Sequence, residues 1–163
     1  MSNLITDERI AHMHGVAEWM YTHAGAFGIP EKDWGQMYLL GLNHDIGYML
    51  NPRNHAISGA EFFPSGSILH HCIFWHCTSP QLYMEFNHCK KEDIPKPMLL
   101  LWYADFMIAS SGEDAGKAIG FDKRIEKIKN IYGEDSVPYL ESKETVEWLK
   151  ANINKDIWEV KNG

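Results

Sequence analysis

Apolar residues recur at helical spacing along this chain, and this pattern predicts α-helices and no sheet. In the first helix the apolar stripe consists of Ile10, Met13, Ala17, Met20 and Ala24. Thr6 is the expected N-cap, because Asp7 and Glu8 follow it in the first turn. His12 flanks the stripe, so its side chain could point toward the interior.

Glycine and proline residues divide the rest of the chain into further helices. The second helix should start near Pro30 and end near Gly47, which places His44 and Asp45 in its last turn. A helix end can relax enough for two adjacent side chains to approach one metal ion. Later helical segments are expected at 55–63, from Ser65 or Ser67 through Trp75, and at 97–110, 121–132 and 141–153. We expect a single compact all-α domain over residues 1–163, with a core at about 6–111 and the helices of 121–153 packed on it.

The composition is that of an ordinary globular domain, with 163 residues, 45% hydrophobic and 23% charged. The formal net charge of −7 argues against a nucleic-acid polymer as partner, because such proteins need a basic face. No apolar run approaches the roughly 18 residues that span a bilayer, and the N-terminus lacks the basic start and apolar core of a secretory signal. We therefore expect a cytoplasmic protein without a membrane partner, and the odd number of cysteines, three, fits a reducing compartment.

The pair His44-Asp45 is the strongest candidate for metal binding. It stands in an Asn-His-Asp-Ile-Gly segment, with His12 upstream and Asp105 downstream. Two imidazoles and two carboxylates form a mixed nitrogen and oxygen ligand set that suits Fe, Mn, Zn or Ni. Asp105 lies in a strongly apolar helix, where an isolated carboxylate is costly to bury, and a bound cation explains its position.

This order of residues resembles the HD-domain superfamily of metal-dependent phosphohydrolases. The family pattern is His, then His-Asp, then Asp on separate helices, and it maps onto His12, His44, Asp45 and Asp105, within residues 6–111. The resemblance implies an all-α fold and hydrolysis of a small phosphoester by a metal-activated water, with nucleotides as the first class to test. His44, Asp45, His55 and Arg53 would then belong to the catalytic machinery.

Some members of the superfamily hold one metal ion and others hold two, and the two-metal pattern adds two histidines. His55, followed by Gly59-Ala60-Glu61, matches the first of them. His76 is favoured for the second, with His71 as the alternative. In the two-metal version Asp45 bridges the ions.

The chain departs from the family at Tyr48, where many members have a lysine that contacts phosphate. Arg53 is the candidate substitute for this charge, and a solvated loop residue is the other interpretation. The departure keeps two alternatives open: a di-iron enzyme that oxidises a small molecule with O₂, and a metal-stabilised binding or regulatory module without turnover.

Four weaker hypotheses accompany this assignment. A separate structural zinc site could use Cys72, His76, Cys77, His88 and Cys89, although no Cys-x-x-Cys pair exists. The aromatic residues that could stack on a base, or simply form the core, are Tyr48, Trp75, Trp102 and Tyr103. The C-terminal helices could cover the pocket, with Tyr132 or Tyr139 contributing. An exposed apolar helix face could form a homodimer.

Overall fold

The computed structural model describes residues 5–153, and it is all-α. Residues 1–4 and 154–163 lie outside the described residues. The predicted absence of a secretory signal and the predicted domain limits of 1 and 163 both involve these positions, and they stay predictions. Within the described part of the chain, the nearest thing to a sheet is one isolated bridge between Ile108 and Ala118. None of the described helices combines the length and apolar character that crossing a bilayer requires.

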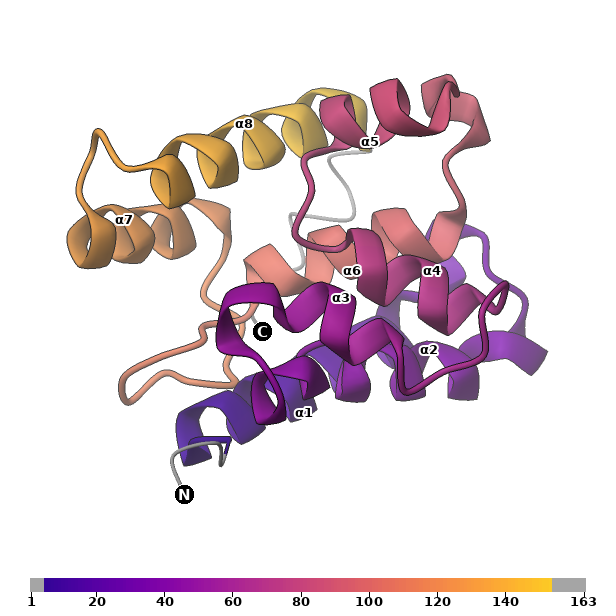
Figure 1. Cartoon of the computed structure of the whole chain (residues 1–163), viewed down its shortest axis with the longest axis horizontal. Coiled ribbons are helices and arrows are strands. Elements are labelled where there is room, and N and C mark those ends of the chain that lie inside the picture. The colour runs from indigo at the N-terminus through magenta and orange to yellow at the C-terminus, as the bar shows by residue number, and fades with distance from the viewer. Residues whose placement is uncertain (1–4, 154–163) are drawn as a thin grey trace.

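Eight α-helices make up this described part (Figure 1). They are α1 (Asp7–His23), α2 (Trp34–Asn43), α3 (His55–Ala60), α4 (Ile68–Trp75), α5 (Pro80–Asn87), α6 (Lys96–Met107), α7 (Phe121–Tyr132) and α8 (Val137–Asn152). Short 3₁₀ turns join several of them, at Gly25–Phe27, Glu31–Asp33, Ile46–Met49, Pro52–Asn54 and Lys91–Asp93.

Side-chain caps set several of the helix starts. The Thr6 side chain accepts a hydrogen bond from the Arg9 amide at 3.1 Å, as the sequence predicts. Ser67, and not Ser65, caps α4. Ser136 caps α8, so this helix begins four residues earlier than the expected start at residue 141.

Two expectations about local structure were wrong. The predicted helix from Pro30 to Gly47 is regular only between Trp34 and Asn43, with a 3₁₀ turn before it and another after it. The segment 78–97, expected to be a break, contains α5. Its start is visible in the sequence, because Ser79 caps the helix and Pro80 occupies the first turn.

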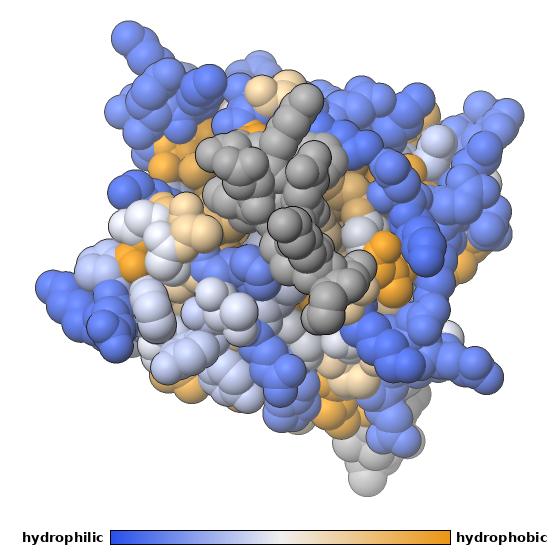
Figure 2. Space-filling model, turned by 180° about the vertical axis from the view of Figure 1, so that it is seen from behind, coloured by the Kyte–Doolittle hydropathy of each residue, from blue (hydrophilic) through white to orange (hydrophobic). Residues whose placement is uncertain are grey.

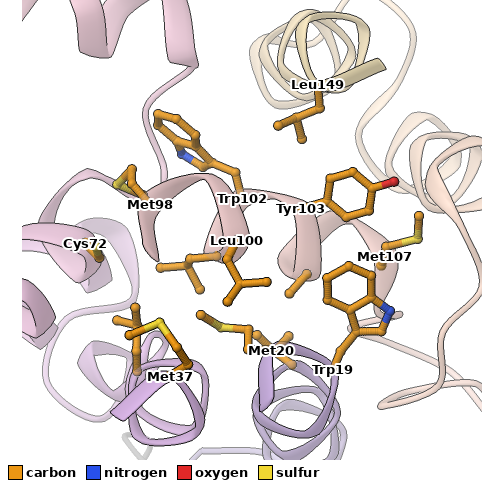
Figure 3. Close-up of a cluster of buried hydrophobic side chains, with 14 of the residues drawn as sticks. Trp19, Met20, Met37, Cys72, Met98, Leu100, Trp102, Tyr103, Met107 and Leu149 are labelled. Atoms are coloured by element: carbon orange, nitrogen blue, oxygen red, sulfur yellow. The ribbon is translucent and has the colours of Figure 1, made fainter. Parts of the chain in front are cut away.

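Helix α6 forms the centre of the protein. Its residues Leu100, Leu101, Trp102 and Tyr103 are fully buried, as expected of a helix that is apolar on every side. Figure 3 shows Leu100, Trp102 and Tyr103 between Leu149 of α8 on one side and the helices α1 and α2 on the other. The labelled partners from α1, α2 and α4 are Trp19, Met20, Met37 and Cys72.

Trp102 and Tyr103 are therefore core residues, and the stacking role considered for them does not apply. The ring centroids of Trp102 and Tyr83 lie 5.5 Å apart in an edge-on contact. The ring of Tyr103 stacks on that of Trp19, with 5.2 Å between the centroids. The Tyr103 ring also lies 4.7 Å from the ring of Phe121 in α7, and Leu149 of α8 belongs to the same core cluster. Helices α7 and α8 therefore pack on the same core as the helices that carry the predicted metal site.

The face in Figure 2 is mainly hydrophilic, and its hydrophobic residues lie in separate groups. Several large apolar residues are nevertheless exposed on the surface of the protein, among them Leu39, Leu50, Phe62, Phe86 and Leu140. They belong to different helices and loops. The homodimer stays a prediction.

Candidate metal centre

The six residues predicted as metal ligands come together in the structure, from five different helices or helix ends. His12 lies on α1 and Asp105 on α6, His55 begins α3, and His76 directly follows the last residue of α4. His44 and Asp45 follow the last residue of α2. His12, His44, Asp45 and His76 are buried, with at most 4% of each residue exposed.

Three of the histidines are oriented by the backbone. The Nδ1 atoms of His44 and His76 lie 2.7 Å and 2.6 Å from the carbonyl oxygen three residues earlier in the chain. Nδ1 of His12 lies 3.2 Å from the carbonyl oxygen of Ala109. A carbonyl accepts only, so each Nδ1 carries the proton and each Nε2 of the neutral ring presents a lone pair. All three Nε2 atoms face the two carboxylates, which is the orientation of a metal ligand.

The first half of the centre consists of His12, His44, Asp105 and one oxygen of Asp45. Nε2 of His12 lies 2.9 Å from Oδ1 of Asp105. Nε2 of His44 lies 3.4 Å from the same oxygen and 3.2 Å from Oδ2 of Asp45. This nitrogen is buried and has no hydrogen-bond partner among the described residues. A lone pair facing two carboxylates without a proton between them is unfavourable, and a cation at this place would satisfy all of these atoms.

The second half consists of His55, His76 and the other oxygen of Asp45. Their two Nε2 atoms are 3.3 Å apart, and each is 3.3 Å from Oδ1 of Asp45. Asp45 therefore turns one carboxylate oxygen toward each half. This is the arrangement that a bridging ligand needs, and it matches the two-metal pattern expected for this residue.

The backbone after α2 explains how adjacent residues reach the same centre. His44 keeps helical torsions, with φ −60° and ψ −30°, whereas Asp45 has φ −105° and ψ 11°. The helix therefore opens at Asp45, as the sequence argument required, and continues as a 3₁₀ turn. Gly47 in this turn lies directly against the backbone of His55, so the start of α3 is positioned beside Asp45.

The centre is built for positive charge. Burial alone would lower the pKa of His44, but the charge of Asp45 and polar contacts with both carboxylates raise it to about 9. Burial also opposes protonation of His55, and its contact with Asp45 raises the pKa to about 9. Burial would raise the pKa of both carboxyl groups, yet the facing imidazoles, foremost His44 for Asp45 and His12 for Asp105, hold them well below the usual range. Without a cation, protons on the imidazoles balance the carboxylates, and a metal ion would replace them.

Two residues next to the centre were not predicted in these roles. Nη1 of Arg9 lies 2.9 Å from Oδ2 of Asp45, and its guanidinium lies over the Tyr48 ring at 4.3 Å. Arg9 is one turn before His12 on α1, so its helical spacing was the available signal. Sγ of Cys77 lies 3.2 Å from Nε2 of His55, and Cys77 had been considered only for a separate zinc site. Surrounding protein atoms would raise the pKa of this thiol, but His76 and His55 lower it to about 6.

A cavity of about 320 Å³ opens over the centre. Asp45, His55, His76 and Asp105 are among the residues that line it. Residues of α7 and α8 also line the cavity; Tyr132 is among them, whereas Tyr139 is not. Arg124 of α7 also lines the cavity, and the sequence contained no signal for this role.

Other candidates lie away from the cavity. Nε2 of His71 lies 2.5 Å from the Tyr83 hydroxyl, on a different surface hollow, so the structure brings His76 and not His71 to the centre. Arg53 lines a neighbouring hollow with Trp75, next to His55 but outside the main cavity. Tyr48 does line the main cavity, where its ring stacks on His55 at 4.0 Å.

The separate zinc site is not formed. Among the described residues, the groups that could hold a metal include Cys77 and His76 but not Cys72, His88 or Cys89. Cys72 is instead part of the apolar core.

Comparisons of the chain with protein-family models, with curated proteins and with solved structures find no match. Fold and site together define the class of protein: an all-α protein with a buried His/Asp cluster that could hold a metal ion.

Proposed function

We propose that this protein is a metal-dependent phosphohydrolase of the HD-domain type, which acts on a small phosphoester. The observation that supports this most is the position of Asp45, which is shared between two half-sites and lines the same cavity as two arginines, Arg9 and Arg124. When bound, divalent cations would lower the pKa of a water molecule and offset the negative charge of phosphoryl oxygens.

Arg124 supports an anionic substrate. Its Nε donates a hydrogen bond to the carbonyl oxygen of Ile108 at 3.1 Å, and it forms no ion pair with an acidic side chain of residues 5–153. Burial lowers the pKa of Arg124, although the nearby Asp105 charge opposes this shift. A partly buried guanidinium without a carboxylate partner is well suited to bind phosphate oxygens in pairs. Arg124 thus takes the place that the sequence argument gave to Arg53.

Arg9 has a positioning role in this proposal. It holds Oδ2 of Asp45 from the side of α1, so the carboxylate cannot rotate away from the two half-sites. Its contact with the Tyr48 ring fixes the guanidinium in turn. Tyr48, which replaces the usual lysine, thereby supports an arginine at the edge of the cavity.

The cavity volume of about 320 Å³ is at the small end of the range for ligand pockets, about 300 to 1,000 Å³. This favours a small phosphoester, with nucleoside monophosphates as the first class to test. The acidic net charge of −7 gives no support to a nucleic-acid polymer as substrate.

The test is phosphate release by metal-loaded protein from a panel of phosphomonoesters, phosphodiesters and nucleoside monophosphates. Asp45→Asn keeps the shape of the side chain but removes its charge, and we expect it to abolish release. Asp135→Asn, on the exposed surface, is the matched control and should retain full activity. The proposal fails if metal-loaded protein releases phosphate from no compound, or if Asp45→Asn is as active as the control.

One observation favours a second candidate function, the oxidation of a small molecule by O₂ at a di-iron centre. Both half-sites have protein ligands, and no lysine is among the residues that line the cavity in the described part of the chain. Oxygen consumption by iron-loaded protein, measured with a panel of small hydroxylated and phosphorylated compounds, distinguishes the two functions. Compound-dependent consumption of O₂ without phosphate release would favour the oxygenase.

A further inference from the structure

Cys77 adds a sulfur atom to the second half of the metal centre. Its Sγ lies 3.2 Å from Nε2 of His55 and 3.4 Å from Nε2 of His76. Helix α4 ends at Trp75, and the chain leaves the helix there, so the adjacent residues His76 and Cys77 both reach the same place.

Sγ of Cys77 and the Nε2 atoms of His55 and His76 have the spacing of ligands around one cation. The two nitrogens lie 3.3 Å apart, and they lie 3.2 and 3.4 Å from the sulfur. Oδ1 of Asp45 lies 3.3 Å from each nitrogen. Metal bonds of about 2.0–2.3 Å at tetrahedral angles imply edges of about 3.3–3.6 Å. The structure thus holds these atoms close to the separations that one cation would impose.

The chemistry of the four atoms agrees with this geometry. Nε2 of His76 offers a lone pair, because Nδ1 of the same ring uses its proton on the carbonyl oxygen of Ile73. Oδ1 of Asp45 can only accept when the carboxylate is ionised. The His55 nitrogen therefore faces two acceptors, and the sulfur faces one of them, Nε2 of His76. One cation could accept a lone pair from each of the four atoms if Cys77 is a thiolate. Hydrogen bonding among the same atoms would instead require a separate proton between each contacting pair.

We propose that Cys77 is a thiolate ligand of the second metal ion, together with His55, His76 and the shared carboxylate of Asp45. The two halves of the centre then differ in chemistry. The first half has only nitrogen and oxygen ligands, whereas the second contains a soft sulfur ligand that favours zinc, cobalt, cadmium or ferrous iron over manganese and magnesium. This assignment goes beyond the proposed function, because it holds whichever reaction the protein catalyses.

Cobalt is the most direct probe, because a thiolate bound to Co²⁺ gives a sulfur-to-cobalt charge-transfer band in the near ultraviolet. Chelator-treated full-length protein is titrated with Co²⁺, and bound cobalt is counted by elemental analysis. The wild-type protein is expected to show the band. Cys77→Ser is expected to lose it and to retain cobalt in the first half, and Cys89→Ser is the matched control, since Cys89 lies outside all of the metal-binding groups found among the described residues.

A second measurement needs no variant. Alkylation of the wild-type thiols, followed by peptide mass spectrometry, should show that Zn²⁺ protects Cys77 and leaves the labelling of Cys89 unchanged. This keeps the inference testable if Cys77→Ser does not fold.

Three results would overturn the inference: cobalt binding without the band, an unchanged band in Cys77→Ser, or labelling of Cys77 that Zn²⁺ does not slow. Each of these leaves the phosphohydrolase proposal intact. Failure of the protein to bind any cation would overturn both, which separates the two kinds of failure.

Discussion

Gly47 offers the sharpest link between packing and the metal centre. It follows His44 and Asp45 in the 3₁₀ turn, and its backbone lies against the first residue of α3. A Cβ atom at Gly47 would lie 1.8 Å from the carbonyl oxygen of His55 and 2.6 Å from the amide nitrogen of Gly59. Gly47 does not have a positive φ, so the requirement for glycine comes from this close approach and not from backbone torsions.

The size of the effect follows from these distances. Since real Cβ contacts essentially never fall below 3.0 Å, the change Gly47→Ala must move the two backbone segments apart by at least about 1.2 Å, the difference between 3.0 and 1.8 Å. Overpacking of this kind costs about 1–3 kcal/mol, and we expect the upper end because both obstructing atoms are backbone. For a chain of this length, about 3 kcal/mol corresponds to a decrease in Tm of roughly 6–12 °C.

The same displacement should disturb the second half of the centre. The distance of 3.3 Å between Nε2 of His55 and Oδ1 of Asp45 depends on the position of α3 beside the turn. We therefore expect Gly47→Ala to lose the second equivalent of bound cobalt or zinc, while His12 and His44 retain the first.

Thermal unfolding followed by circular dichroism, together with metal analysis, tests this prediction. Gly35→Ala is the matched control, because Gly35 lies in α2 and a Cβ atom there meets nothing within 4 Å. The control should be stabilised by about 0.5–1 kcal/mol through helix propensity. The reasoning is refuted if Gly47→Ala unfolds at the wild-type temperature and binds the wild-type amount of metal.

Three further predictions concern charge and capping. Arg124→Gln should raise KM for a phosphoester, or weaken inhibition by inorganic phosphate, by about 10- to 150-fold, since a charge-assisted hydrogen bond contributes about 1.5–3 kcal/mol. An unchanged phosphate affinity would contradict the role of this arginine. In chelator-treated protein, His44 and His55 have pKa values of about 9, above their ordinary 6.5, so their contribution to stability is complete below pH 6.5 and is lost as the pH rises to about 9. The urea midpoint should therefore fall across this window, and a flat profile would count against the charge balance described for the centre. Thr6→Ala should lower the free energy of unfolding by about 1 kcal/mol through loss of the α1 cap, measured by urea denaturation, and an unchanged midpoint would show that the cap contributes nothing.

Much of the fold and part of the site were predictable because the signals are local. Helical periodicity marked α1, a strongly apolar run marked α6, and Thr6 marked the start of α1. A carboxylate in the apolar segment of α6 indicated that Asp105 has a partner of opposite charge. The physical causes are the arrangement of apolar positions, a helix cap and the cost of burying a charge. Each of these acts within a few residues of the chain.

The order of His12, His44, Asp45 and Asp105 also allowed the first half of the centre to be proposed. The family resemblance, and not the helix faces, implied this grouping. His12 and Asp105 lie on α1 and α6, and His44 and Asp45 directly follow α2, so mutual contacts of these three helices bring the four residues together.

Tertiary structure alone decided the rest. Whether His71 or His76 faces the carboxylates depends on where α4 ends and how it lies against α3, and the sequence contains no record of that orientation. The approach of the Cys77 sulfur to His55 depends on the same helix end. Arg124 reaches the cavity only because α7 packs on α6. These contacts join segments far apart in the chain, and packing of whole helices, not local propensity, sets their geometry.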